Sequence, residues 1–391
     1  PRGCIPTVGS MQGSFTTFLL CSQLDPQRRK ILFIDPGFPV QRSQVHILGI
    51  PSESFDIYDY RGEKLGPKIE SVLAAGDVAA IVYSNPNNPA WICLTEDELR
   101  TIGELATRYD AIIIEDLAYL CMDFRKPLGR PFEAPYQASV ARYTDNYILL
   151  VSGSKIFSYA GQRIAVAAIS DALFRREYPA LRRRYNIGRL GDAYVVFLYA
   201  ASSGTSHSAQ HALAAMFRAA ANGELDFVGE ASEYARRARL TKETFLRHGF
   251  HIVYDKDRDE PVSDGFFYTV GYGGLSSAEL LMRVESLLRR YRVYKGKING
   301  KILRQDIVLD EENRRVLRDG AAVELTETEF SILQYLAAQK GKVVSVNDIY
   351  ENVWHEKYMP ASNNTVMVHI VNLRKKLERN PSEPRLIRTV W

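Results

Sequence analysis

Short apolar runs alternate with amphipathic stretches through the first half of the chain. Five runs rich in branched residues predict strands, at Ile31–Ile34, Ala79–Tyr83, Ala111–Glu115, Tyr147–Val151 and Ile164–Ile169. Between the second and third runs, Thr95-Glu-Asp-Glu98 is a capping box that opens an amphipathic helix to about Tyr109. Nearly continuous apolar strands separated by helices predict a mostly parallel sheet covered on both faces. Ligands of such sheets bind at the carboxyl ends of the strands.

The pattern changes in the second half. Residues 171–248 are chiefly helical, and Phe250–Tyr254 and Phe266–Tyr272 predict two further strands. Two short strands follow at Arg304–Asp310 and Arg314–Leu317. Capping boxes at Thr326–Glu329 and Ser345–Asp348 then open two helices, a third helix runs from about Asn363 to Glu378, and Arg385–Trp391 predicts a last strand. The sequence therefore predicts a large α/β domain followed by a small, mostly helical one.

Composition narrows the class of protein. The 391 residues, 46% of them hydrophobic, suffice for two or three domains. Net charge is only +4, but a basic cluster comprises Arg283, Arg289, Arg290, Arg292, Lys295, Lys297 and Lys301. The four cysteines show no CxxC spacing, which argues against a disulfide framework or zinc site and favours the reducing cytoplasm. No apolar run is long enough to cross a bilayer, so no membrane association is predicted.

One stretch carries the clearest chemistry. In Ser152-Gly-Ser-Lys155 a lysine stands among small hydroxyl residues, and Arg163 follows eight positions later. A lysine amine attacks aldehydes, while hydroxyls and a guanidinium bind phosphate. An aldehyde and a phosphate together indicate pyridoxal phosphate. The histidines His207 and His211 have a spacing that could bind a metal, but no third ligand is evident and no metal is predicted.

Five separated motifs carry a family resemblance over roughly residues 1–281. They are Gly9-Ser-Met-Gln-Gly13, Asp35-Pro-Gly-Phe-Pro39, Asn85-Pro-Asn-Asn-Pro89, Asp116-Leu-Ala-Tyr119 and the lysine stretch Ser152–Arg163. In this order they resemble the fold-type I, pyridoxal-phosphate-dependent aminotransferases of class I/II. The resemblance implies a large domain of the PLP-transferase type, amino-group transfer between an amino acid and a 2-oxo acid, and a possible homodimer.

The resemblance also implies roles for individual residues. Lys155 matches the lysine that forms the Schiff base, and Asn88 the partner of the ring hydroxyl. Asp116 and Tyr119 match the aspartate and tyrosine that flank the ring, with the aspartate beside the ring nitrogen. Lys155, Asp116 and Tyr119 are the candidate catalytic residues. Phe38 matches the aromatic residue against the ring, and the phosphate would meet Ser10, Met11, Ser152, Ser154 and Arg163. No residue matches the arginine that holds the substrate carboxylate in the family, so turnover stays open.

Residues 303–391 resemble the winged-helix effector domain of OmpR/PhoB-type response regulators, proteins of phosphorelay signalling. The matching segments are Leu325–Leu333, Val344-Ser345, Val353-Trp354, Thr365–Ile370 and Leu373–Leu377. The resemblance implies transcription regulation through double-stranded DNA, with the third helix in the major groove. The candidate DNA-binding residues are Asn364, Thr365, His369, Asn372, Lys375, Lys376 and Arg388.

The two resemblances predict a three-part chain. Residues 1–281 form an aminotransferase-like domain without its first segment and small domain, residues 282–302 a linker with a receiver-helix remnant, and residues 303–391 the DNA-binding domain. Three hypotheses follow. The chain is a coenzyme-binding enzyme joined to a DNA-binding module, a regulator whose aminotransferase part is inactive, or a chimera of two unrelated genes.

Overall fold

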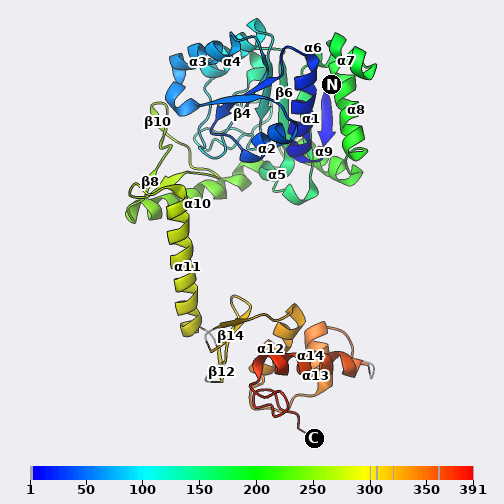
Figure 1. Cartoon of the computed structure of the whole chain (residues 1–391), viewed down its shortest axis with the longest axis vertical. Helices are drawn as coiled ribbons and strands as arrows, with labels where there is room; N and C mark the ends of the chain where they lie inside the picture. Colours follow the sequence, from blue (N-terminus) through cyan, green and yellow to red (C-terminus); the bar gives the residue numbers. More distant parts are fainter. Residues whose placement is uncertain (1–2, 300, 305–306, 320, 360–361, 391) are drawn as a thin grey trace. The chain divides into compact units, whose positions relative to one another are not determined.

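The computed structural model describes residues 3–299, 301–304, 307–319, 321–359 and 362–390; for residues 289–302 and 304 it describes at most the backbone. The chain divides into two compact units, Pro1–Gly274 and Leu275–Trp391, coloured blue to yellow-green and yellow to red in Figure 1. The three-part division at residues 281 and 302 stays a prediction.

The first unit is built on a seven-stranded sheet in the order β1-β7-β6-β5-β4-β2-β3. Neighbouring strands pair in parallel from β3 to β6, and β7 runs antiparallel to both β6 and β1. A mostly parallel sheet is therefore confirmed. The strands are β1 Cys4–Thr7, β2 Lys30–Asp35, β3 Ser52–Asp56, β4 Val78–Ser84, β5 Ile112–Asp116, β6 Tyr147–Ser152 and β7 Ala165–Ile169.

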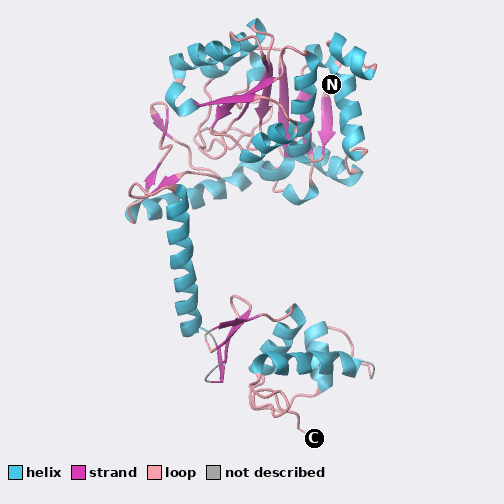
Figure 2. Ribbon diagram, in the orientation of Figure 1, coloured by secondary structure: helices cyan, strands magenta, loops and turns pink. Residues whose placement is uncertain are grey.

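Helices cover both faces of this sheet, as Figure 2 shows. Along β5, Ile113 belongs to one core cluster, while Ile112 and Ile114 belong to the other. Successive residues of a strand point to opposite faces, so a strand buried on both faces must be apolar throughout. The helices are α1 Gly9–Leu24, α2 Pro39–Ile47, α3 Leu65–Leu73, α4 Glu96–Arg108, α5 Gly153–Ile156, α6 Asp171–Arg175, α7 Pro179–Tyr185, α8 Leu190–Ser202, α9 His207–Ala221 and α10 Phe227–Arg247.

Two strands predicted at the end of the first unit are much shorter in the structure. Phe250–Tyr254 and Phe266–Tyr272 form only β8 (His251–Ile252) and β11 (Val270–Gly271), which pair antiparallel. Between them lies a second short pair, β9 (Lys256–Asp257) and β10 (Glu260–Pro261). With only two residues each, these strands add little sheet area, and side-chain contacts hold the segment in place.

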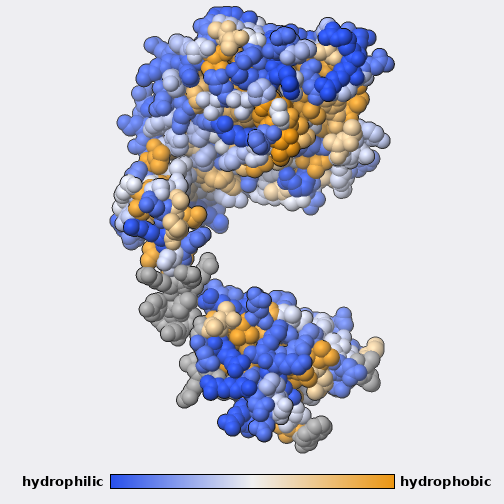
Figure 3. All heavy atoms as spheres, viewed as in Figure 1, coloured by the Kyte–Doolittle hydropathy of each residue, from blue (hydrophilic) through white to orange (hydrophobic). Residues whose placement is uncertain are grey.

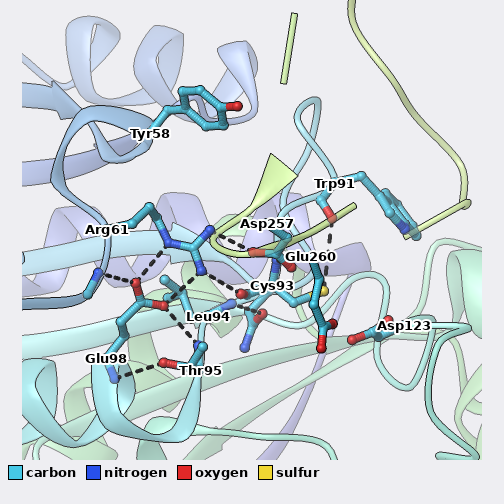
Figure 4. A network of polar contacts seen from close by, with 12 residues as sticks. Tyr58, Arg61, Trp91, Cys93, Leu94, Thr95, Glu98, Asp123, Asp257 and Glu260 are labelled. Carbon is cyan, nitrogen blue, oxygen red and sulfur yellow. Dashed lines mark hydrogen bonds and ion pairs between the residues drawn. The ribbon is translucent and has the colours of Figure 1, made fainter. Parts of the chain in front are cut away.

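A buried ion network joins this segment to Arg61 and, through it, to α4 (Figure 4). Arg61 donates to Glu98 at 2.8 Å and to Asp257 at 2.6 Å. Arg125 donates to the other oxygen of Asp257 at 2.7 Å and also pairs with Asp123 at 2.9 Å. Glu98 is at the same time the last residue of the confirmed capping box of α4. One carboxylate, that of Asp257, thus connects two arginines from distant parts of the chain.

The second unit contains a long helix, a four-stranded antiparallel sheet and three shorter helices. The core packs α12, α13 and α14 against the sheet through buried residues that include Ile307, Phe330 and Val366. Both predicted capping boxes, at Thr326 and Ser345, are present. The elements are α11 Ser277–Asn299, β12 Lys301–Arg304, β13 Ile307–Asp310, β14 Arg315–Arg318, β15 Ala321–Val323, α12 Glu327–Ala338, α13 Val346–Trp354 and α14 Ser362–Leu377.

The last strand, predicted at Arg385–Trp391, is wrong for the described residues 385–390. The backbone N–H groups of Leu386 and Ile387 donate to the Glu378 carboxylate at 2.5 and 3.1 Å. The Ile387 carbonyl accepts from Arg374 at 2.9 Å. Side chains therefore satisfy the backbone groups that a neighbouring strand would otherwise pair.

The surface of the first unit shows apolar side chains on the face that carries α1 and α8 (Figure 3). On α8, Val195 and Val196 are each 47% exposed and Tyr199 is 66% exposed. Among the described helices, none is both long and apolar enough to span a bilayer. The side chains of the basic cluster from Arg289 to Lys301 lie outside the described residues.

Candidate functional site

The ten predicted coenzyme residues all lie at one edge of the sheet. Four of the five motifs follow the carboxyl ends of strands that run in the same direction, namely β1, β2, β4 and β5. The fifth connects β6 to the antiparallel β7, where Ser152 pairs with Ala165 and Ala165 pairs with Thr7. This is the edge at which open α/β sheets bind their ligands.

The phosphate-binding residues would lie where β1 meets α1. Gly9 has φ +66, which disfavours other residues, and a Cβ there would come 2.5 Å from Nη2 of Arg163 and would displace this guanidinium. Ser10 and Met11 lie in the first turn of α1, which has no side-chain cap. Uncapped N–H groups at a helix N-terminus and a guanidinium both attract an anion. The place fits a phosphate group.

Ser152 and Ser154 stand beside this position. The Ser152 hydroxyl is buried and accepts a hydrogen bond from the Ser154 backbone N–H at 3.1 Å, which caps the short helix α5. Arg163 has φ +51 and donates to the Ala160 carbonyl at 2.6 Å, so a tight local turn sets its direction. Local hydrogen bonds thus orient both serine positions and the arginine.

Asp116, at the end of β5, provides a buried negative charge. It accepts hydrogen bonds from Gln41 Nε2 at 2.8 Å and from the Ala118 backbone N–H at 3.1 Å. Burial raises the pKa of Asp116 to about 6, although both hydrogen bonds favour the ionised form. A cation placed against this carboxylate would compensate for the burial and hold it ionised. The protonated nitrogen of a pyridine ring is such a cation.

Asn88 and Tyr119 form a second polar pair close to Asp116. Asn88 Nδ2 donates to the Tyr119 hydroxyl at 3.3 Å, and the Asn88 backbone N–H donates to the Ser84 hydroxyl at 3.1 Å. Burial, and next the charge of Asp116, raise the pKa of Tyr119 despite the Asn88 bond. Tyr119 therefore stays protonated at neutral pH and can donate to a ligand oxygen.

Lys155 lies on α5 with its amine 5.4 Å from the centre of the Phe266 ring. Within the described part of the chain this amine has neither an ion pair nor a hydrogen bond. Phe266 belongs to a cluster of five rings, with centroid distances of 4.0–6.3 Å, formed by Trp91, Tyr119, Tyr234, Phe266 and Phe267. An amine without a counterion is available for covalent chemistry.

Sequence reasoning missed two residues of this region. Gln41 donates a hydrogen bond to Asp116. The sequence feature that could have identified Gln41 is its position in the first turn of α2, three residues after Phe38. Phe38 itself is half-buried at the N-terminus of α2. Asn87 Nδ2 donates to the carbonyl of Pro36, two residues before Phe38, at 2.6 Å. Trp91 is fully buried with φ +62, a conformation that a bulky residue rarely adopts. No sequence pattern predicted that Trp91 would lie in this region.

The predicted DNA-binding residues fall into two groups on the second unit. Asn364, Thr365 and Lys375 are exposed on α14, and Arg388 is exposed beyond it. The others contact the protein itself: Lys376 Nζ lies 2.6 Å from the buried Glu329 carboxylate, His369 packs 5.8 Å from the Trp354 ring, and Asn372 is half-buried. Across the described residues no three His, Cys, Asp or Glu side chains gather as metal ligands.

Two family models match the chain. Residues 5–300 match Aminotransferase class I and II, and residues 320–391 match Transcriptional regulatory protein, C terminal. Among solved structures, an aspartate aminotransferase from Thermus thermophilus is 22% identical at a TM-score of 0.49, covering 68% of this chain and 60% of its own. One from Thermotoga maritima is 18% identical at a TM-score of 0.49, covering 67% of this chain and 60% of its own.

Curated relatives resemble the chain over a shorter stretch. Regulatory protein VanRc of Enterococcus gallinarum is 40% identical over 117 residues, which is 29% of this chain and 50% of that protein. Regulatory protein VanR of Enterococcus faecium is 36% identical over 153 residues, 37% of this chain and 66% of that protein. The chain spans about half the length of the first such relatives. With the family model covering residues 5–300, the chain belongs to the aminotransferase class I and II family, and it carries an OmpR/PhoB-type DNA-binding domain at residues 320–391.

Proposed function

We propose that the first unit binds pyridoxal phosphate and transfers an amino group between an amino acid and a 2-oxo acid. The family is pyridoxal-phosphate-dependent, which supports the proposal. The observation that carries it is the opening at Gly9, which admits the Arg163 guanidinium to the uncapped start of α1. Lys155 on α5 and the buried Asp116 follow adjacent strands at the same edge.

Each residue has a separate part in this proposal. When bound, the coenzyme supplies an aromatic ring that accepts the electrons released from the substrate carbon. Asp116 would place a negative charge at the ring nitrogen, and Asn88 and Tyr119 would donate hydrogen bonds to the ring oxygen. Lys155 Nζ would hold the coenzyme and, as a free amine, would move the proton of the substrate carbon. Phe38 would pack against the ring face.

Amino acids should change the absorbance of the coenzyme-loaded protein, because transfer of the amino group alters the electronic system of the coenzyme. Adding a 2-oxo acid should restore the original spectrum, since the reaction is reversible. The measurement is a visible absorbance titration of the 391-residue chain with each of the common amino acids. An unchanged spectrum with all of them would contradict amino-group transfer and would leave coenzyme binding standing.

For the second unit we propose sequence-specific binding to double-stranded DNA, with α14 in the major groove. The family match at residues 320–391 and the regulatory relatives support this. The exposed Asn364 and Thr365 at the start of α14 suit base contacts, and Lys375 and Arg388 suit phosphate contacts.

DNA as partner and the cysteine pattern together support a place in the cytoplasm. The exposed apolar side chains of α8 support pairing with a second copy of the chain.

Lys375→Ala should weaken binding to duplex DNA several-fold and reduce the slope of log affinity against log salt by about 1, because one phosphate contact is lost. Lys376→Ala is the matched comparison, since Lys376 already pairs with the buried Glu329. Its main effect should be lower stability of the second unit. Fluorescence anisotropy at several salt concentrations measures the DNA affinity of both variants. Equal salt slopes for wild type and Lys375→Ala would refute the phosphate contact.

A further inference from the structure

Two valines lie on the outer face of α14, among the polar residues proposed to meet DNA. Val368 is 57% exposed and Val371 is 42% exposed. Residues three apart on a helix are neighbours, so their side chains form one apolar strip. The core-facing side of α14 is distinct from this strip and consists of the buried Val366, Ile370, Leu373 and Leu377.

Neither helix propensity nor core packing accounts for the two valines. Valine is a poorer helix former than alanine, because its branched side chain loses rotamer freedom on a helix. Neither Val368 nor Val371 belongs to the core of the unit. The strip formed by Val368 and Val371 is therefore a candidate contact surface for a binding partner. Its neighbours along the exposed face are Thr365 before it and Lys375 after it.

We propose that Val368 and Val371 read thymine methyl groups, so that the second unit prefers duplexes rich in A·T pairs. The inference rests on the proposed insertion of α14 into the major groove. There a thymine presents its C5 methyl group to apolar side chains, whereas guanine is read by arginine or lysine. On the described outer face of α14, Asn364 can pair with adenine. Arg374 follows Val371 by three residues, but its guanidinium donates to the Ile387 carbonyl and the Thr389 hydroxyl, so the next exposed cation along this face is Lys375.

The test compares duplexes that differ in one methyl group. The probes are alternating dA·dT, dA·dU and dG·dC duplexes of equal length, bound to the full chain at one salt concentration. Deoxyuridine lacks the C5 methyl, so dA·dT should bind more tightly than dA·dU by about fourfold for each methyl buried. The double variant Val368→Ala/Val371→Ala should bind dA·dT and dA·dU equally. Its affinity for dA·dU should match that of wild type.

Two further variants guard against a general effect of mutation. Val343→Ala removes a valine that is 77% exposed between α12 and α13 and should keep the full preference for dA·dT. Val371→Thr retains one methyl and should keep part of that preference. Alanine favours helix more than valine does, so the double variant should fold.

The outcomes separate this inference from the proposed function. If wild type binds dA·dT and dA·dU equally, in a salt-dependent manner that needs Lys375, the methyl contact is refuted and DNA binding stands. Unchanged methyl preference in the double variant would likewise refute the role of the two valines. If wild type binds none of the three duplexes, the proposed DNA binding itself fails, and the inference with it.

Discussion

Replacement of Lys155 by alanine should abolish the visible absorbance of protein-bound pyridoxal phosphate. The amine of Lys155 is the candidate attachment point, and within the described residues no carboxylate holds it. Without it, the phosphate contacts at Gly9 and Arg163 remain, but no covalent bond can form with the aldehyde. The measurement is an absorbance spectrum after coenzyme addition and removal of the excess, followed by borohydride reduction and peptide mass spectrometry.

Lys64→Ala is the matched control, because Lys64 is an exposed lysine of the same unit and lies outside the five motifs. It should leave the absorbance band and the labelled peptide unchanged. The unfolding midpoint of Lys155→Ala should match that of wild type, which separates loss of the site from loss of the fold. A band of full intensity in Lys155→Ala would show that another amine reacts and would overturn the assignment.

Arg61→Ala should lower the free energy of unfolding of the first unit by about 3–5 kcal/mol, the range for breaking a buried ion pair on one side. Arg61 is only 9% exposed, and its partners Glu98 and Asp257 are 1% and 3% exposed (Figure 4). Removing the guanidinium leaves both carboxylates in the interior. Arg125 still reaches Asp257, whereas Glu98 keeps only backbone hydrogen bonds, from Gly62 and Thr95.

The pH dependence of stability provides a second signature. Burial opposes the ionisation of Glu98, but the hydrogen bonds and charge of Arg61 outweigh it and hold its pKa below the ordinary 4.5. A carboxyl whose pKa is lowered by folding stabilises the protein above its unfolded pKa, and this contribution is lost as pH falls through the folded value. Wild type should therefore lose stability below about pH 4.5, and Arg61→Ala should lose less there.

Urea unfolding followed by circular dichroism measures the change in free energy at each pH. The control is Arg175→Ala, since Arg175 and its partner Asp171 are 66% and 62% exposed. An exposed pair of this kind contributes about 0–1 kcal/mol. If Arg61→Ala costs no more than Arg175→Ala, the network does not anchor the segment that contains Asp257.

The central strands and the capped helices could be predicted from sequence because their signals are local. The runs at Ile31–Ile34 and Tyr147–Val151 became β2 and β6 with one residue added at one or both ends. Strands β1 and β3 were missed: in β3, only Phe55 is buried, so no continuous apolar run marked it. The last strand failed because Glu378 and Arg374, not a neighbouring strand, satisfy its backbone.

The sequence by itself determined the family resemblance, the two kinds of domain and the five motifs, because each depends on residue types at fixed spacings along the chain. Only the tertiary structure decided which of those residues meet. Arg163 lies beside Gly9 because β7, which follows it, runs antiparallel to β1. Gln41 reaches Asp116 because of the way α2 packs. The aromatic cluster around Phe266 and the Arg61 network join residues more than 100 positions apart. Such contacts depend on how distant segments pack, and local pattern does not encode that.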